Sequence, residues 1–396
     1  ETLPPEMRRQ YGLATLREAL YNIHFPQSPE ALRQAQYRLK FEELLGVQLN
    51  VMARRSERLA RNDGFYFARV GESFNTFYKE KLPFPLTGAQ KRVVREIRQD
   101  TVTGCQMNRL LQGEVGSGKT LVALLSMLLA VDNGFQACMM APTEILARQH
   151  YATLTRLLDG LTVQVAILTG ASKARERRAA LEGVASGEVQ LLVGTHALIE
   201  DRVRFANLGL VVIDEQHRFG VDQRAALSAK GDDPHLLVMS ATPIPRTLAL
   251  MIYGDLDVSV IDELPPGRRS IETYAVPSSY HERIYTFLEK QLAEGRQAYI
   301  VCPMVEENGE LPDERKAVTA YAEKLQKEVL PNRTVRFLHG KMKAKEKETV
   351  MRAFAAGEID VLVSTTVVEV GVDVPNAALM IIENAERFGL SQLHQL

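Results

Sequence analysis

The residues best suited to chemistry lie in one short segment, Gly113-Glu114-Val115-Gly116-Ser117-Gly118-Lys119-Thr120. An apolar run precedes this segment and the helix-like run 121–130 follows it, so the glycines lie between a strand and a helix. Glycines in that context let backbone N–H groups turn toward phosphate oxygens, and the helix N-terminus adds positive potential. Lys119 would reach the β- and γ-phosphates of a nucleotide, and the Thr120 hydroxyl would hold Mg²⁺. The predicted nucleotide-binding residues here are Gly113, Gly116, Ser117, Gly118, Lys119 and Thr120. The competing interpretation is an ordinary turn with a surface lysine.

Two adjacent acids form the second chemical feature. Asp214 and Glu215 directly follow the apolar run 210–213, and open α/β sheets bind ligands at the carboxyl ends of their strands. We expect Asp214 to hold the Mg²⁺ shell and Glu215 to orient or activate the attacking water, with Lys119 completing the catalytic set. The alternative is a pair of solvated acids at a strand end.

Composition limits the class of protein. The 396 residues suffice for two or three domains, and a hydrophobic content of 45% suffices for full cores. A net charge of −1 argues against a wholly basic surface, so a nucleic acid would have to bind in a local groove. Cys105, Cys138 and Cys302 lack metal-ligand spacing, and we expect buried thiols in a reducing compartment. No apolar run is long enough to cross a bilayer and no signal peptide is visible, so we expect a cytoplasmic protein without membrane contact.

Residues 1–84 are predicted to form a helical linker. Ser28 is a predicted N-cap, and Pro29 begins a helix that runs to about residue 61. The aromatic stretch 62–84 is expected to pack onto the next domain, with base stacking as the alternative. Arginines gather at the end of the long helix, where they either form a solvated face or contact a DNA backbone. They are Arg54, Arg55, Arg58 and Arg61.

The rest of the chain alternates between strand and helix patterns, which predicts parallel sheets covered by helices on both faces. The pattern runs through 85–266 and restarts in 267–396, after the stretch Leu264-Pro265-Pro266-Gly267. We therefore expect an α/β protein of two lobes, hinged near Gly267. The predicted strands are 109–111, 137–141, 163–168, 191–194, 210–213 and 236–239 in the first lobe, and 298–302, 335–338, 361–363 and 379–382 in the second.

The order of these motifs resembles that of superfamily 2 helicases. Besides the phosphate loop and Asp214-Glu215-Gln216-His217, the matching segments are Leu86-Thr87-Gly88-Ala89-Gln90, Ala141-Pro142-Thr143-Glu144, Leu168-Thr169-Gly170, Gly194-Thr195-His196, Ser240-Ala241-Thr242-Pro243, Phe337-Leu338-His339-Gly340 and 364–373. The resemblance implies two RecA-like P-loop NTPase lobes that use ATP and Mg²⁺. It also implies that Gln90 reads the adenine edge, that His217 joins the catalytic set, and that Gly371 and Asp373 contact the nucleotide.

The same resemblance implies a path for DNA across both lobes. The implied nucleic-acid residues are Thr143, Gly170, Thr195, His339, Gly340 and Thr365. They would bind phosphates through hydroxyl and backbone N–H groups, so binding would be independent of base sequence. Bland alternatives stay open, because the threonines could be helix caps, the glycines could be turn residues and His339 could be structural. The basic runs 172–178 and 341–347 are equally compatible with solvated helix faces.

The segment Asp214–Gly220, taken with 241–248, resembles the group that holds RecG, the transcription-repair coupling factor and PriA-like enzymes. Three further features resemble the RecG family of branch-migration helicases more closely. They are the stretch 253–268, the stretch 382–395, and the amino-terminal segment 1–5 taken with 41–45. The resemblance implies a monomeric bacterial motor, associated with the nucleoid, that remodels stalled forks and Holliday junctions in repair and recombination. The alternatives are a duplex translocase that displaces bound protein like the coupling factor, a P-loop kinase or small-molecule ATPase, and a module that only binds nucleotide and DNA.

RecG proteins also carry a wedge barrel and, after motif VI begins, arginine fingers. The sequence 1–396 contains neither, so we expect this chain to bind ATP but hydrolyse it poorly.

Overall fold

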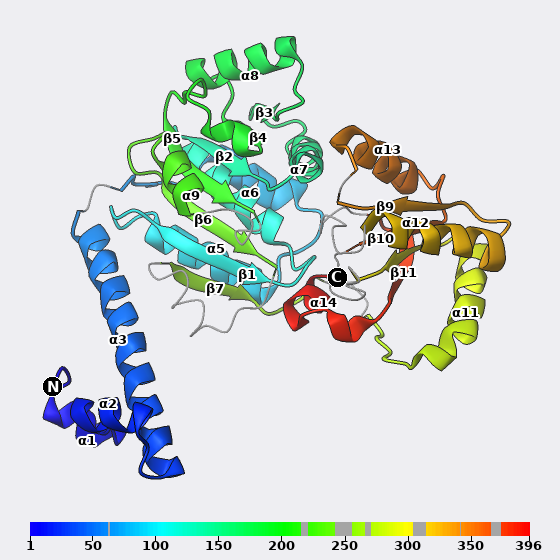
Figure 1. The fold of residues 1–396 in the computed structure, drawn as a ribbon. Helices are drawn as coiled ribbons and strands as arrows, with labels where there is room; N and C mark the ends of the chain where they lie inside the picture. Colours follow the sequence, from blue (N-terminus) through cyan, green and yellow to red (C-terminus); the bar gives the residue numbers. More distant parts are fainter. Residues whose placement is uncertain are drawn as a thin grey trace.

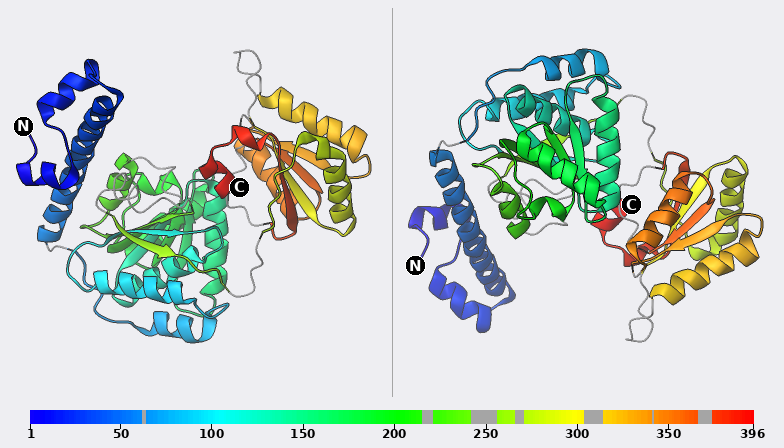
Figure 2. Two further views of the ribbon diagram at one scale, coloured as in Figure 1. Left: turned by 90° about the horizontal axis from the view of Figure 1, so that it is seen from below. Right: turned by 90° about the horizontal axis from the view of Figure 1, so that it is seen from above.

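The structure, a computed structural model, describes residues 1–61, 64–214, 221–241, 256–265, 271–303, 314–340, 342–365 and 374–396. Figure 1 shows three parts in chain order: a helical unit, a first lobe built on the larger sheet and a second lobe built on the smaller one. The helical unit and the second lobe lie on opposite sides of the first lobe (Figure 2). Two parallel-sheet α/β lobes preceded by helices were predicted, and this fold is confirmed. The predicted hinge at Gly267 lies outside the described residues.

The helical unit consists of α1 (Pro5–Tyr11), α2 (Leu16–His24) and α3 (Pro29–Arg61). The backbone N–H of Ala31 donates to Ser28 Oγ over 3.1 Å, which confirms the predicted cap of the long helix. Leu13, which matches the apolar spacing of α2, lies in the loop before it, because Thr15 caps that helix through a capping box with Glu18.

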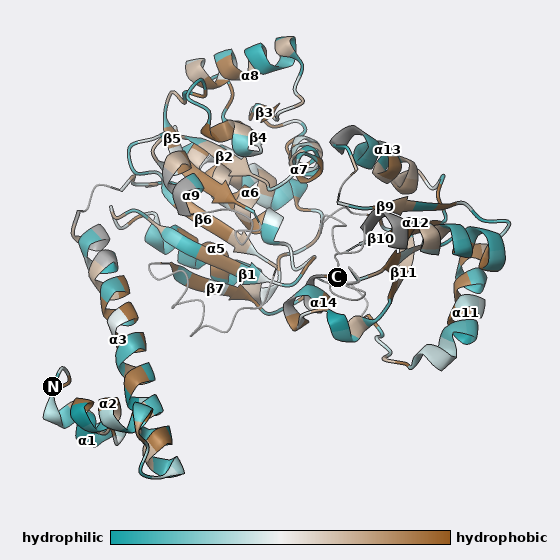
Figure 3. Cartoon of the chain, viewed as in Figure 1, coloured by the Kyte–Doolittle hydropathy of each residue, from teal (hydrophilic) through white to brown (hydrophobic). Residues whose placement is uncertain are grey.

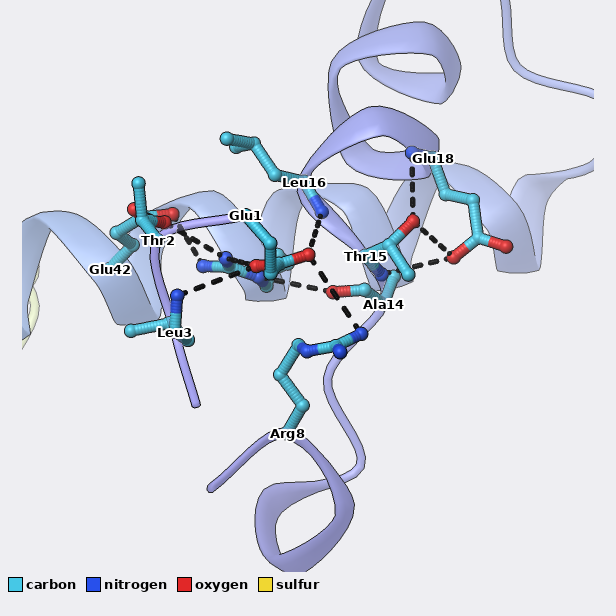
Figure 4. Close-up of polar contacts among 10 residues, drawn as sticks. Glu1, Thr2, Leu3, Arg8, Ala14, Thr15, Leu16, Glu18 and Glu42 are labelled. Carbon is cyan, nitrogen blue, oxygen red and sulfur yellow. Dashed lines mark hydrogen bonds and ion pairs between the residues drawn. The ribbon is translucent and has the colours of Figure 1, made fainter. Parts of the chain in front are cut away.

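A buried arginine joins the helices of this unit. The side chain of Arg38 is fully buried, and it donates to the Ala14 carbonyl over 3.0 Å and to carboxylates of Glu1 and Glu42 over 2.7 and 2.5 Å. Figure 4 shows Glu1, Ala14 and Glu42 brought together at this point. The pKa of Glu1 is lowered to about 2, chiefly by the backbone N–H of Leu16 and also by Arg38. The charge of the arginine is therefore compensated inside the unit.

Arg55 corrects one expectation for the arginines of α3. Its guanidinium lies 2.6 Å from a carboxylate oxygen of Asp257 in the first lobe. Arg55 is thus neither simply solvated nor directed at DNA, because it links α3 to the first lobe. The side chains of Arg54, Arg58 and Arg61 lie outside the described set.

The aromatic connector packs onto the first lobe, as predicted. It contains α4 (Glu72–Thr76) and a π-helical turn, Phe77–Lys81. Phe67 and Phe77 are fully buried in the core of the first lobe. The ring of Phe67 contacts those of Phe135 and His235, with centroids 5.3 and 4.7 Å apart. These rings are therefore core residues.

The first lobe contains a seven-stranded sheet of order β3-β4-β2-β5-β6-β1-β7, in which every pair is parallel. Its strands are β1 (Asn108–Gly113), β2 (Gln136–Met140), β3 (Val165–Leu168), β4 (Leu191–Gly194), β5 (Leu208–Ile213), β6 (His235–Ser240) and β7 (Asp257–Ile261). Its helices are α5 (Gly88–Asp100), α6 (Lys119–Asp132), α7 (Glu144–Leu157), α8 (Ala174–Ser186) and α9 (Val221–Ser228). Strand β7 was not predicted, because Asp257 and Ser259 interrupt its apolar pattern and only one side of this edge strand is paired.

Hydropathy explains the layers of the first lobe. Figure 3 shows apolar strands between helices that are polar on their outer faces. Helix α6 differs, since residues 121–130 are all buried. A helix that is apolar on all sides can only be stable inside a domain. The phosphate loop before α6 is therefore attached to the most buried helix of the lobe.

The second lobe contains a four-stranded parallel sheet of order β11-β8-β10-β9. Its strands are β8 (Gln297–Val301), β9 (Val335–Leu338), β10 (Val361–Ser364) and β11 (Ala377–Ile382). Its helices are α11 (His281–Ala293), α12 (Glu314–Lys324), α13 (Ala344–Ala355) and α14 (Leu390–Gln395). All four strands overlap the predicted ones, because each is a short, nearly continuous apolar run.

Two further expectations concern membranes and thiols. In the described ranges, no helix is both long and apolar enough to span a bilayer. None of the three cysteines forms a disulfide, but only Cys138 is fully buried, whereas Cys105 and Cys302 are half-buried. Burial raises the pKa of the Cys138 and Cys302 thiols to about 12, so both stay protonated at neutral pH.

Candidate functional site

The phosphate loop connects β1 to α6 in the predicted strand–loop–helix order. Gly116 and Gly118 adopt φ values of +76° and +86°, a conformation that other residues rarely tolerate. A Cβ atom on Gly118 would lie 2.3 Å from the side-chain nitrogen of Gln90, and one on Gly113 would lie 2.5 Å from Ser117 Oγ. Gly118 is thus required by both backbone conformation and space, Gly116 by its conformation and Gly113 by the space around it.

The polar groups of the loop suit an anion. The Lys119 ammonium donates to the carbonyls of Gly113 and Glu114 over 2.6 and 3.0 Å, so it folds over the loop. Ser117 Oγ is buried and has no hydrogen-bond partner in the described parts of the chain. Phosphate oxygens would give the lysine and the serine better partners, because charge-assisted bonds are stronger than those to carbonyls. The residues present therefore fit a nucleotide phosphate group.

Gln90 supports the loop from helix α5. Its side-chain oxygen accepts from the N–H of Thr87 over 2.9 Å, and its side-chain nitrogen donates to the Ser117 carbonyl over 2.8 Å. The residue is fully buried. These bonds use one of the two N–H groups and one of the two oxygen lone pairs of the amide, so the others are free to contact an adenine. The geometry therefore adds a structural task, joining the cap of α5 to the phosphate loop.

Asp214 lies immediately after β5, as the acid motif predicted. Its backbone N–H donates to the Met140 carbonyl over 2.9 Å, and its carboxylate is 2.7 Å from His150 Nε2. Asp214 and His150 are 8 and 9% exposed, so the pair is buried. Glu215 and His217, predicted as catalytic, and Gly371 and Asp373, predicted to contact the nucleotide, lie outside the described residues.

A divalent cation would find ligands of the right kind here. Thr120 is the second residue of α6 and half-buried, and it offers a hydroxyl oxygen. Asp214 offers a carboxylate oxygen, and oxygen donors are what Mg²⁺ prefers. The described residues contain no group of three or more His, Cys, Asp or Glu that could hold a metal. Mg²⁺ in proteins is usually held by one or two carboxylates together with phosphates and water.

Helix α7 begins at the predicted nucleic-acid residue Thr143. Its hydroxyl accepts from the N–H of Leu146 over 3.4 Å, so the helix-cap interpretation holds in this structure. The carboxylate of Glu144 accepts from the Thr169 hydroxyl over 3.3 Å and pairs with Arg148 over 2.7 Å. The start of α7 is thereby tied to the loop that contains Gly170.

Two predicted threonines occupy matching places in the two lobes. Thr195 follows β4 and donates its N–H to the Leu168 carbonyl at the end of β3, over 3.4 Å. Thr365 follows β10 and donates to the Leu338 carbonyl at the end of β9, over 3.3 Å. Both hydroxyls are buried without a partner in the part of the chain that the structure describes. Thr195 precedes a short 3-10 turn but makes no capping hydrogen bond through its side chain. The two lobes thus present the same local arrangement.

The predicted glycine and histidine sites differ in character. Gly170 is exposed, has no positive φ, and a Cβ there would meet no described atom within 4 Å. Gly170 lies in a turn closed by the Ser172 N–H, which donates to the Thr169 carbonyl over 3.2 Å, but neither its backbone conformation nor the space around it requires a glycine there. His339 is 4% exposed, and its ring stacks on that of Phe337 with centroids 6.0 Å apart. Gly340 follows His339 in the turn after β9.

The basic runs are partly structural. Arg177 is ion-paired with Glu200 and Arg178 with Glu182. Ion pairing reduces the charge that such a helix face offers to a phosphate backbone. Lys341 lies outside the described residues.

Some contacts at the site have no signal in the sequence. His150 was not singled out, because a histidine inside a helix pattern is usually a core or surface residue. Glu263 was also missed, although its carboxylate accepts from the N–H of Ala89 over 3.2 Å and so caps the start of α5. Ile145 packs against the second lobe's core cluster that includes Met351 and Phe354. All of these contacts join residues far apart in the sequence.

Comparison with known proteins places these features in a family. A DEAD/DEAH box helicase domain model matches residues 87–251, and a helicase conserved C-terminal domain model matches residues 281–396. The ATP-dependent DNA helicase RecG of Synechocystis is 50% identical over 396 residues, which is 100% of this chain and 47% of that protein. The RecG of Bacillus subtilis is 49% identical, with 100% of this chain and 58% of that protein aligned.

The chain belongs to the RecG family. A solved structure of RecG bound to a three-way DNA junction aligns with 100% of the chain at 44% identity and a TM-score of 0.84, covering 52% of that protein. The helicase MrfA, bound to DNA, is similar in fold alone, at 20% identity and a TM-score of 0.57 over 79% of this chain and 47% of that one. The chain spans about half the length of the RecG proteins it matches. The two sheets are accordingly the RecA-like lobes of a helicase.

Proposed function

We propose that this chain is the two-lobed motor of an ATP-dependent DNA helicase that remodels branched DNA. The observation that carries the proposal is the match of the whole chain, at a TM-score of 0.84, to a RecG bound to a three-way junction. The phosphate loop, with Ser117 Oγ lacking a described partner and Lys119 folded over the glycines, supports ATP as the fuel. We further propose that the protein acts as a monomer at the bacterial nucleoid, in repair and recombination.

In this proposal, the phosphate loop binds the triphosphate. Lys119 exchanges its carbonyl partners for β- and γ-phosphate oxygens, and the backbone N–H groups of Gly116 and Gly118 point at the phosphates. Thr120 and Asp214 hold Mg²⁺, which neutralises charge on the phosphates when bound. Glu215 orients the attacking water and His217 supports it. Gly113 and Ser117 shape the loop, Gln90 fixes it, and Gly371 and Asp373 contact the nucleotide from the second lobe.

DNA would lie across the two lobes at the carboxyl ends of matching strands. Thr195 and Thr365 hold equivalent positions, and so do the loops that contain Gly170 and Gly340. Each lobe would bind the DNA backbone at one of these two sites, and Thr143 and His339 would lie beside them. Closure of the lobes around ATP and their opening after hydrolysis would then change the distance between the two DNA-binding sites. The buried hydroxyls of Thr195 and Thr365 would have to turn outward to reach a phosphate.

A strand-displacement assay on a three-way junction tests this proposal against its alternative. The chain, supplied with ATP and Mg²⁺, should separate a labelled strand from the junction, and the Lys119→Ala variant should not. A duplex carrying a tightly bound protein block is the second substrate. Clearance of the block without any strand separation from the junction would favour a protein-displacing translocase instead.

A further inference from the structure

Helix α7 contacts three places that the proposed motor must coordinate. Its cap, Thr143, belongs to the proposed DNA grip, and the carboxylate of Glu144 accepts from Thr169 beside Gly170. Ile145 packs against the core of the second lobe. Figure 1 shows α7 on the side of the first lobe that faces α13. The first turn of the helix therefore contacts both the loop of the proposed DNA path and the second lobe.

Two turns further along, the same helix reaches the proposed Mg²⁺ ligand. His150 Nε2 lies 2.7 Å from Asp214 Oδ2, and both residues are less than 10% exposed. Seven residues of helix separate Thr143 from His150, a rise of about 10 Å. A helix is stiff over that length, so a displacement of its first turn moves the imidazole as well.

We propose that His150 is a positioning residue that fixes the orientation of the Asp214 carboxylate and couples DNA binding at the start of α7 to Mg²⁺–nucleotide binding. This inference rests on the proposed function. It adds a residue that neither the motifs nor the family comparison assigns. A ligating carboxylate has two oxygens, and a hydrogen bond to one of them directs the other toward the metal.

The geometry limits what else His150 could do. The ring is buried beside a carboxylate, so it is not available to DNA as a surface contact. Its Nε2 lies at hydrogen-bond distance from Asp214, so this nitrogen is engaged by the carboxylate and is not available to a metal. A purely structural role would require only that the pair fill space and satisfy its hydrogen bond. The proposed role requires in addition that changes at the start of α7 alter the metal site.

The test measures the binding of a fluorescent, non-hydrolysable ATP analogue by the chain. Mg²⁺ is titrated with and without three-way-junction DNA for the wild type, His150→Phe, which keeps a ring without a donor, and His150→Gln, which keeps a donor. In the wild type, the junction should tighten Mg²⁺-dependent binding at least fivefold. His150→Phe should weaken the Mg²⁺ dependence about tenfold and abolish the effect of the junction, while Mg²⁺-free binding stays as in the wild type. His150→Gln should restore most of both effects.

His281→Leu is the matched control. His281 also pairs with a carboxylate, since its Nε2 lies 3.1 Å from Glu383, but this pair belongs to the second lobe. The variant should show wild-type Mg²⁺ dependence and wild-type coupling. A folded His150→Phe variant that behaves like the wild type would overturn the inference and leave the proposed function intact. If the wild type bound no nucleotide at any Mg²⁺ concentration, both the inference about His150 and the proposed function would be contradicted.

A measurement on the wild type keeps the inference testable should His150→Phe not fold. The chain has eight histidines, and imidazole-¹⁵N labelling with His150→Gln for assignment isolates one ring signal. The Nε2 signal of His150 should move on addition of the Mg²⁺–nucleotide and move again on addition of the junction. A signal that responds to neither addition would contradict the coupling.

Discussion

The side-chain nitrogen of Gln90 donates to the backbone carbonyl of Ser117 over 2.8 Å, so helix α5 holds the phosphate loop directly. The other end of the same amide accepts from the N–H of Thr87 and closes the cap of α5. One side chain thus joins a helix start to the loop that would bind ATP.

Gln90→Ala should weaken nucleotide binding about fivefold, because the hydrogen bond of about 1 kcal/mol to the Ser117 carbonyl no longer orders the loop. Fluorescence titration with an ATP analogue measures this change. Gln326→Ala is the control, since Gln326 also bridges backbone groups, donating to the carbonyls of Leu330 and Arg333, but in the second lobe. Equal nucleotide affinity for Gln90→Ala and the wild type would show that the loop holds its shape unaided.

Gly118→Ala should abolish nucleotide binding. The added Cβ would lie 2.3 Å from the Gln90 side-chain nitrogen in a backbone with φ +86°, and the strain is roughly 1–3 kcal/mol before any displacement of Gln90. Gly134→Ala separates the two causes, because Gly134 has φ +82° and open space around its Cβ position. That variant should lose stability in thermal denaturation yet bind nucleotide normally. Normal binding by Gly118→Ala would refute the packing described for the loop.

Gly170→Ala should fold with an unchanged melting temperature, because this exposed glycine has neither a positive φ nor a described neighbour within 4 Å of a Cβ. Its affinity for three-way-junction DNA should fall several-fold, since a methyl group would obstruct the approach of a phosphate to the backbone. Fluorescence anisotropy with labelled junction gives the affinity. An affinity equal to that of the wild type would remove Gly170 from the proposed DNA path.

The stability of the first lobe should fall between pH 6.5 and pH 4. Burial lowers the pKa of His235 from 6.5 to about 4, so in this window the unfolded chain binds a proton that the folded chain excludes. The free energy of unfolding is therefore greatest above pH 6.5 and decreases by about 3 kcal/mol as the pH approaches 4.

Chemical denaturation at several pH values measures this dependence. His235→Gln supplies the comparison, because glutamine can still accept the hydrogen bond that the Met107 N–H donates to His235 Nδ1 over 2.9 Å. That variant should lose part of the pH dependence. If the free energy of unfolding depended on pH equally in the wild type and in His235→Gln, groups other than His235 would cause the dependence.

Local patterns predicted the parts of the fold that depend on neighbouring residues. The Ser28 cap, the strand–loop–helix around Lys119 and the strand that ends at Asp214 all follow from short-range spacing. The pairing of His150 with Asp214 spans 64 residues and depends on how α7 packs beside β5, which spacing alone does not report. Hydroxyl burial at Thr195 likewise depends on the whole lobe.

The arginines of α3 also show that local patterns do not predict contacts between residues far apart in the sequence. Their clustering suggested either solvent or DNA, because both are what a charged helix face usually meets. Arg55 instead forms an ion pair with Asp257, the first residue of edge strand β7. This strand was not predicted, because polar residues interrupt its apolar pattern. Because β7 was not predicted, its contact with Arg55 of α3 could not be predicted either.

ATP hydrolysis in the presence and absence of three-way-junction DNA tests the central claim most directly, namely that a nucleotide at Lys119 drives a motor that engages branched DNA. The wild-type chain should hydrolyse ATP slowly alone and faster with the junction, and Lys119→Ala should show no junction-dependent rate. A wild-type rate that is the same with and without the junction, or a junction-dependent rate that survives in Lys119→Ala, would contradict the account.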